Sequence, residues 1–312
     1  MSIKPPRLRK RDLIGLIAPA SPPSSEEKIH GAVRYLENRG YEVLVGKHVQ
    51  DVHGYLAGKD EDRLADLNRF IRDDSVKAIV AIRGGYGTPR LLDGVDYDAL
   101  AKDPKVIVGY SDLTGLQSAI YTRTGLITFS GPMGGVEMWD AIDPYTEQNF
   151  WRMLESPEAP GPLVNPEDQP VTTIRTGTGE GTLLGGNLSL VMSLFGTPYL
   201  SSLSGAVLVF EDVDEAPHRI DRMFTQLRHA GVWADAAAVV FGTFTDCVPS
   251  DPAKPHLTVD QLQKEFTASV SGPVLANVQY GHIPRKLTMP IGARCRVDGG
   301  KGIVEILEPV VA

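Results

Sequence analysis

The sequence predicts a two-domain α/β protein. Through the first half, strand-like apolar runs alternate with segments of helical periodicity. A stretch rich in proline and acidic residues interrupts this pattern, and the alternation then resumes and closes in a strand-rich end. The length of 312 residues also exceeds that of a typical single domain. We therefore predict an N-terminal domain over residues 1–152, a linker over 153–175 and a C-terminal domain over 176–312.

The first half begins with a short strand and a helix. The run "LIGLIAP" predicts a buried strand, and Ile29, Val33 and Leu36 follow it at near-helical spacing, with Gly40 as the stop. The alternation continues through "YEVLVG", "DEDRLADLNRFIRD", "VKAIVAI", "PKVIVGY" and "DLTGLQSAIYTRTG". Such a pattern favours a parallel sheet that is covered by helices.

The second half follows the string "ESPEAPGPLVNPEDQP", whose composition is typical of a linker or a wandering loop. Beyond it, strand-like and helix-like strings alternate again: "EGTLLGGNLSLVMSLFGTP", "GAVLVFEDVDEAP", "HRIDRMFTQLRHAG" and "AAAVVFGTF". The end, "ARCRVDGGKGIVEILEP", is rich in strand-forming residues. These strings predict a second α/β domain.

Composition excludes several classes of protein. Hydrophobic residues make up 42% and charged residues 22%, which is ordinary for a globular enzyme. The formal net charge of −8 argues against nucleic acid as the main partner, because phosphate binding needs a clustered positive field. Cys247 and Cys295 are far apart and form no CxxC pair, so neither a zinc ribbon nor a disulfide framework is expected.

The N-terminal segment has a basic start, a short apolar run and small residues, and in this it resembles a secretory signal peptide. Asp12 interrupts that pattern, and the apolar run Leu13–Ala18 stops at Pro19, which suits a first strand as well. No stretch of the sequence approaches the length of a membrane span. We therefore expect a cytoplasmic protein.

Four polar clusters follow apolar runs: "RGGYG" at 83–87, "SD" at 111–112, "ED" at 211–212 and "GHIPRK" at 281–286. In open α/β sheets, ligands bind outside the carboxyl ends of the strands. We therefore expect the chemistry of the protein to lie at these clusters.

The serine of the second cluster has two interpretations. Gly109 precedes Ser111 by two residues, as in a nucleophile elbow, where a sharp strand-to-helix corner exposes the hydroxyl. Leu113 stands where such an elbow often carries a second glycine, and Ser111 could instead be the N-cap of the following helix. This stretch alone leaves both interpretations open.

The glycines of "RGGYG" allow backbone N–H groups to approach a ligand closely, which suits an oxyanion hole or an anion nest. The string does not match the GxGxxG fingerprint of dinucleotide-binding proteins. No HExxH motif and no tight His/Asp grouping indicates a metal site. We therefore predict no cofactor and no metal.

The last two clusters supply an acid and a base. Glu211 and Asp212 end a predicted strand, where a carboxylate can orient a histidine, although "EDVDE" also suits a solvated acidic turn. His282 stands on a predicted loop, where catalytic bases are often found, although a single histidine is more often structural.

Taken together, six strings resemble the L,D-carboxypeptidase family of serine peptidases, which includes muramoyl-tetrapeptide carboxypeptidases and microcin C immunity peptidases. The strings run in order from Leu13 to Gly292 and so cover nearly the whole chain: "LIGLIAPASP", "AIRGGYGTPRLL", "VIVGYSDLTGL", "LLGGNLSLV", "FEDVDEAPHRIDRMFTQL" and "YGHIPRKLTMPIG".

The resemblance implies a Ser-His-Glu triad made of Ser111, His282 and Glu211. It also implies an amidotransferase-like N-terminal domain with a parallel sheet that carries the nucleophile, and a C-terminal domain that carries the glutamate and the histidine. The active site would lie in the cleft between the two domains, often in a homodimer. In this family's motif the second glycine of the elbow is absent, as it is here.

The backbone N–H groups of Asp112 and Gly85 would form the oxyanion hole. A carboxypeptidase must also bind the terminal carboxylate of its substrate, for which a fixed cation is the usual partner. The sequence does not rank the three cations that adjoin the site strings. The candidate substrate-binding residues are Arg83, Gly84, Asn187, Arg285 and Lys286.

The leading hypothesis is release of terminal D-alanine from a murein tetrapeptide during peptidoglycan recycling, through an acyl-enzyme. One alternative is a microcin C-type immunity peptidase that cleaves a peptidyl- or aminoacyl-nucleotide amide. It would call for an aromatic group to stack on the base, for which the tryptophans are Trp139, Trp151 and Trp233. A second alternative is a non-catalytic α/β protein that binds a small molecule.

Overall fold

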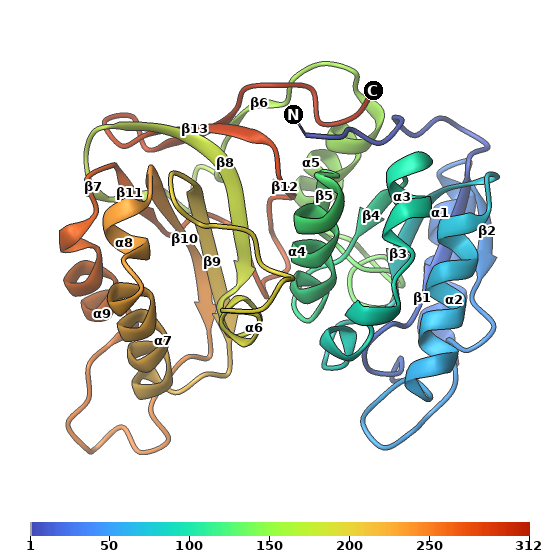
Figure 1. Cartoon of the computed structure of the whole chain (residues 1–312), viewed down its shortest axis with the longest axis horizontal. Coiled ribbons are helices and arrows are strands. Elements are labelled where there is room, and N and C mark those ends of the chain that lie inside the picture. Colours follow the sequence, from blue (N-terminus) through green and yellow to red (C-terminus); the bar gives the residue numbers. More distant parts are fainter. Residues whose placement is uncertain (1) are drawn as a thin grey trace.

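The structure, a computed structural model that describes residues 2–312, contains two sheets that lie side by side (Figure 1). The first has six strands in the order β12-β5-β4-β3-β1-β2, and the second has eight in the order β6-β14-β13-β8-β9-β10-β11-β7. Helices flank both sheets, which confirms the α/β fold class that the sequence predicts.

Five strands of the first sheet run parallel, as the alternation of strands and helices predicts. They are β1 (Leu13–Ile17), β2 (Glu42–Val45), β3 (Val76–Ala81), β4 (Val106–Val108) and β5 (Thr128–Ser130). The helices that follow these strands and pack on the sheet or on one another are α1 (Glu26–Asn38), α2 (Asp60–Arg72), α3 (Tyr97–Lys102) and α4 (Leu113–Thr124). β4 is buried throughout, so the corner at its carboxyl end is held rigidly by the sheet.

The second sheet has a parallel centre of four strands with antiparallel strands on both sides. Its parallel strands are β8 (Thr178–Asn187), β9 (Val207–Val213), β10 (Ala238–Thr245) and β11 (Val274–Ala276). Its antiparallel strands are β6 (Gly161–Leu163), β7 (Thr172–Arg175), β13 (Arg294–Asp298) and β14 (Ile303–Ile306). The remaining helices are α5 (Pro144–Glu155), α6 (Leu188–Ser193), α7 (Pro217–His229), α8 (Val232–Asp235) and α9 (Val259–Phe266).

The two halves are joined by more than the segment over 153–175, which holds the end of α5 together with β6 and β7. β12 (Met289–Ile291) leaves the second half and pairs antiparallel with β5 at the edge of the first sheet. One continuous cluster of buried apolar side chains includes Val80 of the first sheet and Phe241 of the second. The halves therefore share a core.

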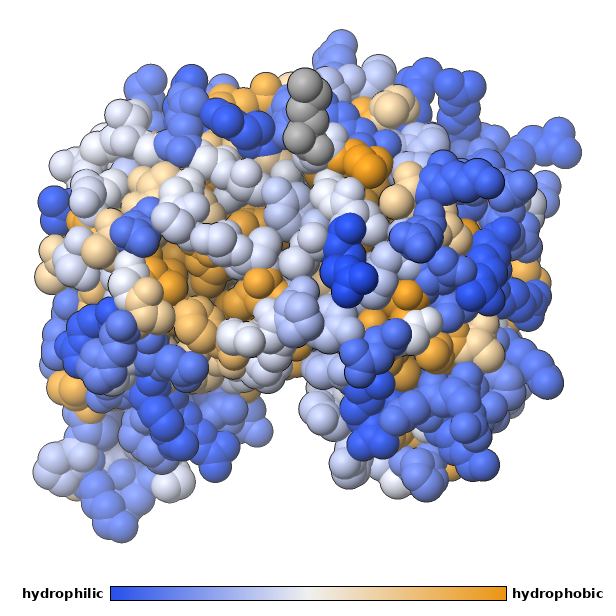
Figure 2. All heavy atoms as spheres, in the orientation of Figure 1, coloured by the Kyte–Doolittle hydropathy of each residue, from blue (hydrophilic) through white to orange (hydrophobic). Residues whose placement is uncertain are grey.

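The surface is hollowed between the two halves, and the parts of both halves that flank this notch are largely hydrophilic (Figure 2). Within residues 2–312, none of the helices combines the length and the apolar character that crossing a bilayer requires.

Candidate active site

Ser111 lies at the corner between β4 and α4, in a backbone conformation that is rare for a residue with a side chain. Its φ is +63°, in the left-handed region. The N-cap of α4 is Asp112, so Ser111 precedes the helix and the N-cap interpretation of this serine is wrong. Such conformations cost about 1–3 kcal/mol and cluster at functional sites, where the surroundings maintain them.

The glycine loop after β3 packs directly against this corner. A Cβ atom placed on Gly84 would lie 2.9 Å from the Cβ of Ser111 and 3.1 Å from its Oγ, so only glycine fits there without displacing the serine. Ser21, from the loop after β1, holds the glycine loop in place. Its N–H donates to the carbonyl of Gly84 (3.1 Å) and its Oγ accepts from the N–H of Tyr86 (3.2 Å).

Asp112 connects the same loop to the start of α4. Its buried carboxylate accepts a hydrogen bond from the N–H of Thr88 (2.7 Å), and the Thr88 hydroxyl donates to the Asp112 carbonyl (2.5 Å). Burial raises the pKa of Asp112 to about 6, against the opposing effect of the hydrogen bonds from Thr88. The two segments that carry the predicted oxyanion-hole donors are thus fixed to each other.

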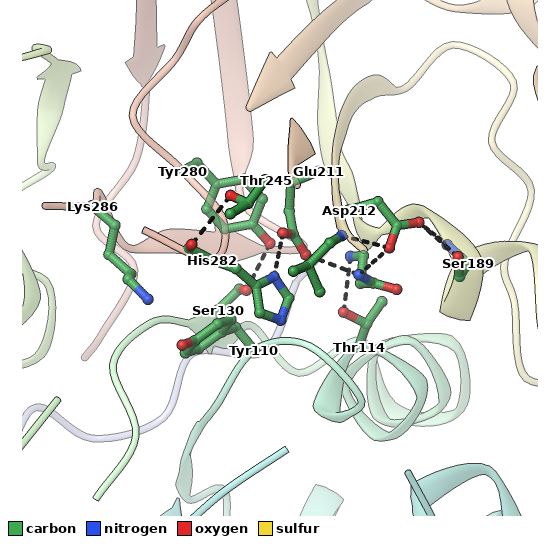
Figure 3. A network of polar contacts seen from close by, with 12 residues as sticks. Tyr110, Thr114, Ser130, Ser189, Glu211, Asp212, Thr245, Tyr280, His282 and Lys286 are labelled. Atoms are coloured by element: carbon green, nitrogen blue, oxygen red, sulfur yellow. Dashed lines mark hydrogen bonds and ion pairs between the residues drawn. The ribbon is translucent and has the colours of Figure 1, made fainter. Parts of the chain in front are cut away.

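Glu211 and His282 form a hydrogen-bonded pair at the end of β9 (Figure 3). Nδ1 of His282 lies 2.7 Å from Oε2 of Glu211, and the Glu211 side chain is 1% exposed. Because a carboxylate only accepts hydrogen bonds, Nδ1 carries a proton and Nε2 of the neutral ring is left as the basic nitrogen. Glu211 and Asp212 are both buried, so the alternative of a solvated acidic turn is wrong for these two residues.

Asn187 lies between the two buried carboxylates. Its Nδ2 is 3.2 Å from Oε1 of Glu211 and 3.0 Å from Oδ1 of Asp212. Asp212 also accepts hydrogen bonds from the N–H (3.0 Å) and the hydroxyl (2.6 Å) of Ser189. Burial raises the pKa of Asp212. The sequence names Asn187 as a substrate-binding candidate, and the structure shows its amide held by this buried network.

Contacts from two sides bring the serine corner and the histidine together, through Thr114 and Tyr110, which Figure 3 shows beside the Glu211–His282 pair. On one side, the Thr114 N–H donates to the Ser111 carbonyl (2.9 Å), and the Thr114 hydroxyl accepts from the N–H of Asn187 (3.0 Å). On the other side, the ring of Tyr110 packs edge-to-face on the imidazole of His282, with 5.0 Å between ring centroids. The corner of the first sheet that carries Ser111 therefore lies next to the part of the second half that carries His282 and Glu211.

Two domain models of one protein family match the chain. Residues 14–131 match the model of the LD-carboxypeptidase N-terminal domain, and residues 180–297 match that of the C-terminal domain. The chain belongs to the LD-carboxypeptidase family. The resemblance predicted from the six strings is therefore confirmed, and the protein is a carboxypeptidase.

Three proteins illustrate the likeness. A probable murein peptide carboxypeptidase of Bacillus subtilis is 40% identical over 96% of this chain and 92% of its own. The structure of a muramoyltetrapeptide carboxypeptidase from Oxalobacter formigenes superposes with a TM-score of 0.81 at 30% identity, over 95% of this chain and 99% of its own. The microcin C7 self-immunity protein MccF of Escherichia coli is 25% identical over 95% of this chain and 93% of its own.

Two of the three candidate cations of this LD-carboxypeptidase are exposed. Arg285 lies 3.0 Å from Asp168 and 3.6 Å from Asp143, and its side chain is 45% exposed. Arg83 is also exposed, and its guanidinium donates to the carbonyl of Pro22 (3.1 Å).

Lys286, the third cation, is buried in a cluster that the sequence does not reveal. Its Nζ lies 2.6 Å from Oε1 of Glu137 and 3.8 Å from the centroid of the Tyr110 ring. The Tyr110 hydroxyl donates to the same Glu137 oxygen (2.8 Å), and the Met133 N–H donates to the other (2.8 Å). Burial lowers the pKa of Lys286, which Glu137 opposes. Tyr110 stands in the "GYSD" string, but no sequence pattern connects it to Glu137.

His48, Asp51 and Asp62 form a second group of ionisable side chains, which the sequence does not predict. Asp51 lies 2.7 Å from Nδ1 of His48, whereas Asp62 lies 4.0 Å from Nε2. The two carboxylates thus face different nitrogens of one ring, and only that of Asp51 lies at hydrogen-bonding distance.

Proposed function

We propose that this protein is a serine L,D-carboxypeptidase that releases the terminal D-alanine of a murein tetrapeptide in peptidoglycan recycling. The observation that carries the proposal is the buried Glu211–His282 pair, packed through Tyr110 beside the strained corner of Ser111. The relatives from B. subtilis and O. formigenes, whose names refer to murein peptides, support the substrate class.

In the proposed mechanism, Nε2 of His282 removes the proton of Ser111 as Oγ attacks the carbonyl carbon of the scissile bond. The imidazolium then gives that proton to the leaving amine, the C–N bond breaks, and an ester to Ser111 remains. Water, activated by the same imidazole, hydrolyses the ester. The Glu211 carboxylate, at 2.7 Å from Nδ1, holds the required tautomer and stabilises the imidazolium.

The backbone N–H groups of Asp112 and Gly85 would bind the oxyanion of the tetrahedral intermediate. The fit of Gly84 against Ser111 and the hydrogen bonds between Thr88 and Asp112 support this role, because they fix both segments around the serine. Loss of one such donor typically costs about 3 kcal/mol of transition-state stabilisation.

The proposal also includes what the resemblance implies for the whole enzyme. We expect the enzyme to be a cytoplasmic homodimer that needs no cofactor. Within each chain, residues 1–152 and 176–312 would be the two domains.

The tryptophans favour a murein peptide over a nucleotide-linked antibiotic. Trp151 and Trp233 are 3% and 1% exposed, so neither ring is free to stack on a base. Trp139 has the ammonium of Lys28 over its ring at 5.2 Å. The ring of Tyr110 lines the pocket beside His282, but it is buried and already packs on the imidazole and on the ammonium of Lys286.

The proposal is tested by mass spectrometry of the protein after incubation with L-Ala-γ-D-Glu-meso-diaminopimelate-D-Ala. We expect the wild type to release one alanine and Ser111→Ala to be slower by at least about 10⁴-fold. Ser193→Ala, which changes an exposed serine on α6, is the matched control and should retain release.

A fluorophosphonate probe separates the other outcomes. An intact tetrapeptide together with labelling at Ser111 would support a serine hydrolase whose substrate is a nucleotide-linked antibiotic instead of a murein peptide. Absence of both cleavage and labelling would refute the triad and favour a binding protein.

A further inference from the structure

A pocket of about 290 Å³ lies beside His282. Its wall includes the imidazole of His282, the ring of Tyr110 and the charged side chains of Glu137, Asp143 and Lys286, while its remaining lining is apolar. Figure 3 shows Lys286 and Tyr110 on the same side of the imidazole, away from Asp212 and Ser189. This pocket holds the one candidate cation that shares a wall with the proposed base.

The position of the base determines where the substrate carboxylate must lie. In the proposed reaction the imidazole of His282 protonates the amine nitrogen of the leaving amino acid. The carboxylate carbon of that amino acid is two bonds away from this nitrogen, at about 2.5 Å. The terminal carboxylate must therefore enter the space next to the imidazole, and a cation that binds it must face the same space.

Lys286 meets this requirement with a charge that is already held in place. An ammonium has three N–H donors. One is used by Glu137 at 2.6 Å, and the ring of Tyr110 lies 3.8 Å from Nζ. Among residues 2–312, Glu137 is the only hydrogen-bond acceptor in contact with this ammonium, so a donor remains for a ligand. The Lys286 side chain is 2% exposed, so the protein has already removed most of its hydration.

We propose that Lys286 binds the terminal carboxylate of the substrate and thereby restricts the enzyme to the last residue of a peptide. The inference rests on the proposed function and deepens it. Glu137 and Tyr110 are positioning residues, since they hold the ammonium in the pocket without contacting the reacting atoms. The other acid of the wall, Asp143, has its own cation in Arg285 at 3.6 Å, so an incoming carboxylate meets no unpaired negative charge.

The surroundings of the other two cations do not suit this role. Arg285 is 45% exposed, so its charge is hydrated, and the wall of the pocket does not include it. Arg83 adjoins Gly84, on the glycine loop that would bind the oxyanion, and the wall of the pocket does not include it.

The test compares the tetrapeptide with its C-terminal D-alaninamide, which keeps the scissile bond but lacks the terminal charge. For each variant, kcat/KM is measured on both substrates, and the ratio of acid to amide is the readout. We expect the wild type to favour the acid, and Lys286→Met to reduce the ratio by about 10- to 100-fold. Arg285→Met and Arg83→Met should retain the wild-type ratio.

Lys286→Met leaves the Glu137 carboxylate without its cation, and this unpaired charge could itself repel the substrate. A double variant therefore removes both charges. In Glu137→Gln/Lys286→Met neither charge remains, and we expect the same loss of the ratio. An unchanged ratio in both Lys286 variants, or an equal loss on acid and amide, would overturn the role of Lys286 and leave the carboxypeptidase intact. A wild type that releases neither D-alanine nor its amide would instead overturn the proposed function together with this inference.

Discussion

The serine side and the histidine side of the site are built in different ways. Ser111 is held by backbone: a φ of +63° at the end of a buried strand, with Gly84 packed on its side chain. Glu211 and His282 are held by side chains, in a buried network that includes Asn187. The serine side thus depends on the absence of a side chain at Gly84, whereas the histidine side depends on hydrogen bonds between polar side chains. Substitutions can test each dependence separately.

The largest effect should come from the histidine side. Glu211→Gln has one oxygen for two donors, the Asn187 amide and Nδ1 of His282, so the imidazole loses its orientation or its tautomer. We expect kcat to fall by about 10³- to 10⁴-fold while the protein stays folded. Steady-state kinetics and a thermal unfolding curve check both parts. Asp214→Asn, an exposed position three residues along, should behave as the wild type.

Two glycines sharpen the comparison. On Gly84, a Cβ would meet the Ser111 side chain at 2.9 Å, so Gly84→Ala should displace the nucleophile. On Gly281, φ is +126° and a Cβ would meet the Glu211 carboxylate at 2.8 Å, so Gly281→Ala should also strain the backbone. We expect Gly84→Ala to lower kcat by about 10²-fold with little loss of stability, and Gly281→Ala to lose about 1–3 kcal/mol of stability as well.

Chemical denaturation and kinetics on both variants decide this contrast. Equal destabilisation by the two alanines would contradict the view that the serine side is limited by space alone.

The last test concerns pH and affects stability rather than the rate of the reaction. Burial raises the pKa of Asp112 from 3.8 to about 6, so the folded protein holds this proton more tightly than the unfolded chain. The associated stability is therefore present below about pH 4 and is lost as the pH rises to about 6, a change of about 3 kcal/mol. Asp112→Asn should remove this decline. Denaturant unfolding at several pH values between 4 and 7 measures it, and identical pH dependence in both proteins would refute the assignment.

Local strings were sufficient to predict much of the molecule. Each parallel strand of the first sheet depends on a few consecutive residues, whose periodicity the sequence displays. The stretch around Ser111 taken alone suits an elbow and an N-cap equally, and only the family strings favour the elbow. The triad candidates Glu211 and His282 came from family strings rather than from spacing. Taken alone, "EDVDE" suits a solvated turn, because sequence does not show that the tertiary structure buries two carboxylates and supplies Asn187 between them.

Contacts between distant residues could not be predicted. Glu137 is 27 residues from Tyr110 and 149 from Lys286, so no periodicity relates the three. β12 has only three residues and pairs with β5 at the edge of the first sheet. No pattern in the sequence indicates which strand it joins. Both features arise from how the halves pack, which a linear pattern does not encode.

The return of β12 to the first sheet has a consequence for how the protein is made. A ribosome synthesises the chain from the N-terminus, so the Ser111 corner exists long before residues 282–291 emerge. Until then β5 lacks its edge partner and the serine has no imidazole beside it. β12 follows His282 by only a few residues, so the strand and the histidine emerge at nearly the same time. In the proposed mechanism, a nascent chain would therefore lack its general base, and hydrolytic activity would begin only when the first sheet closes.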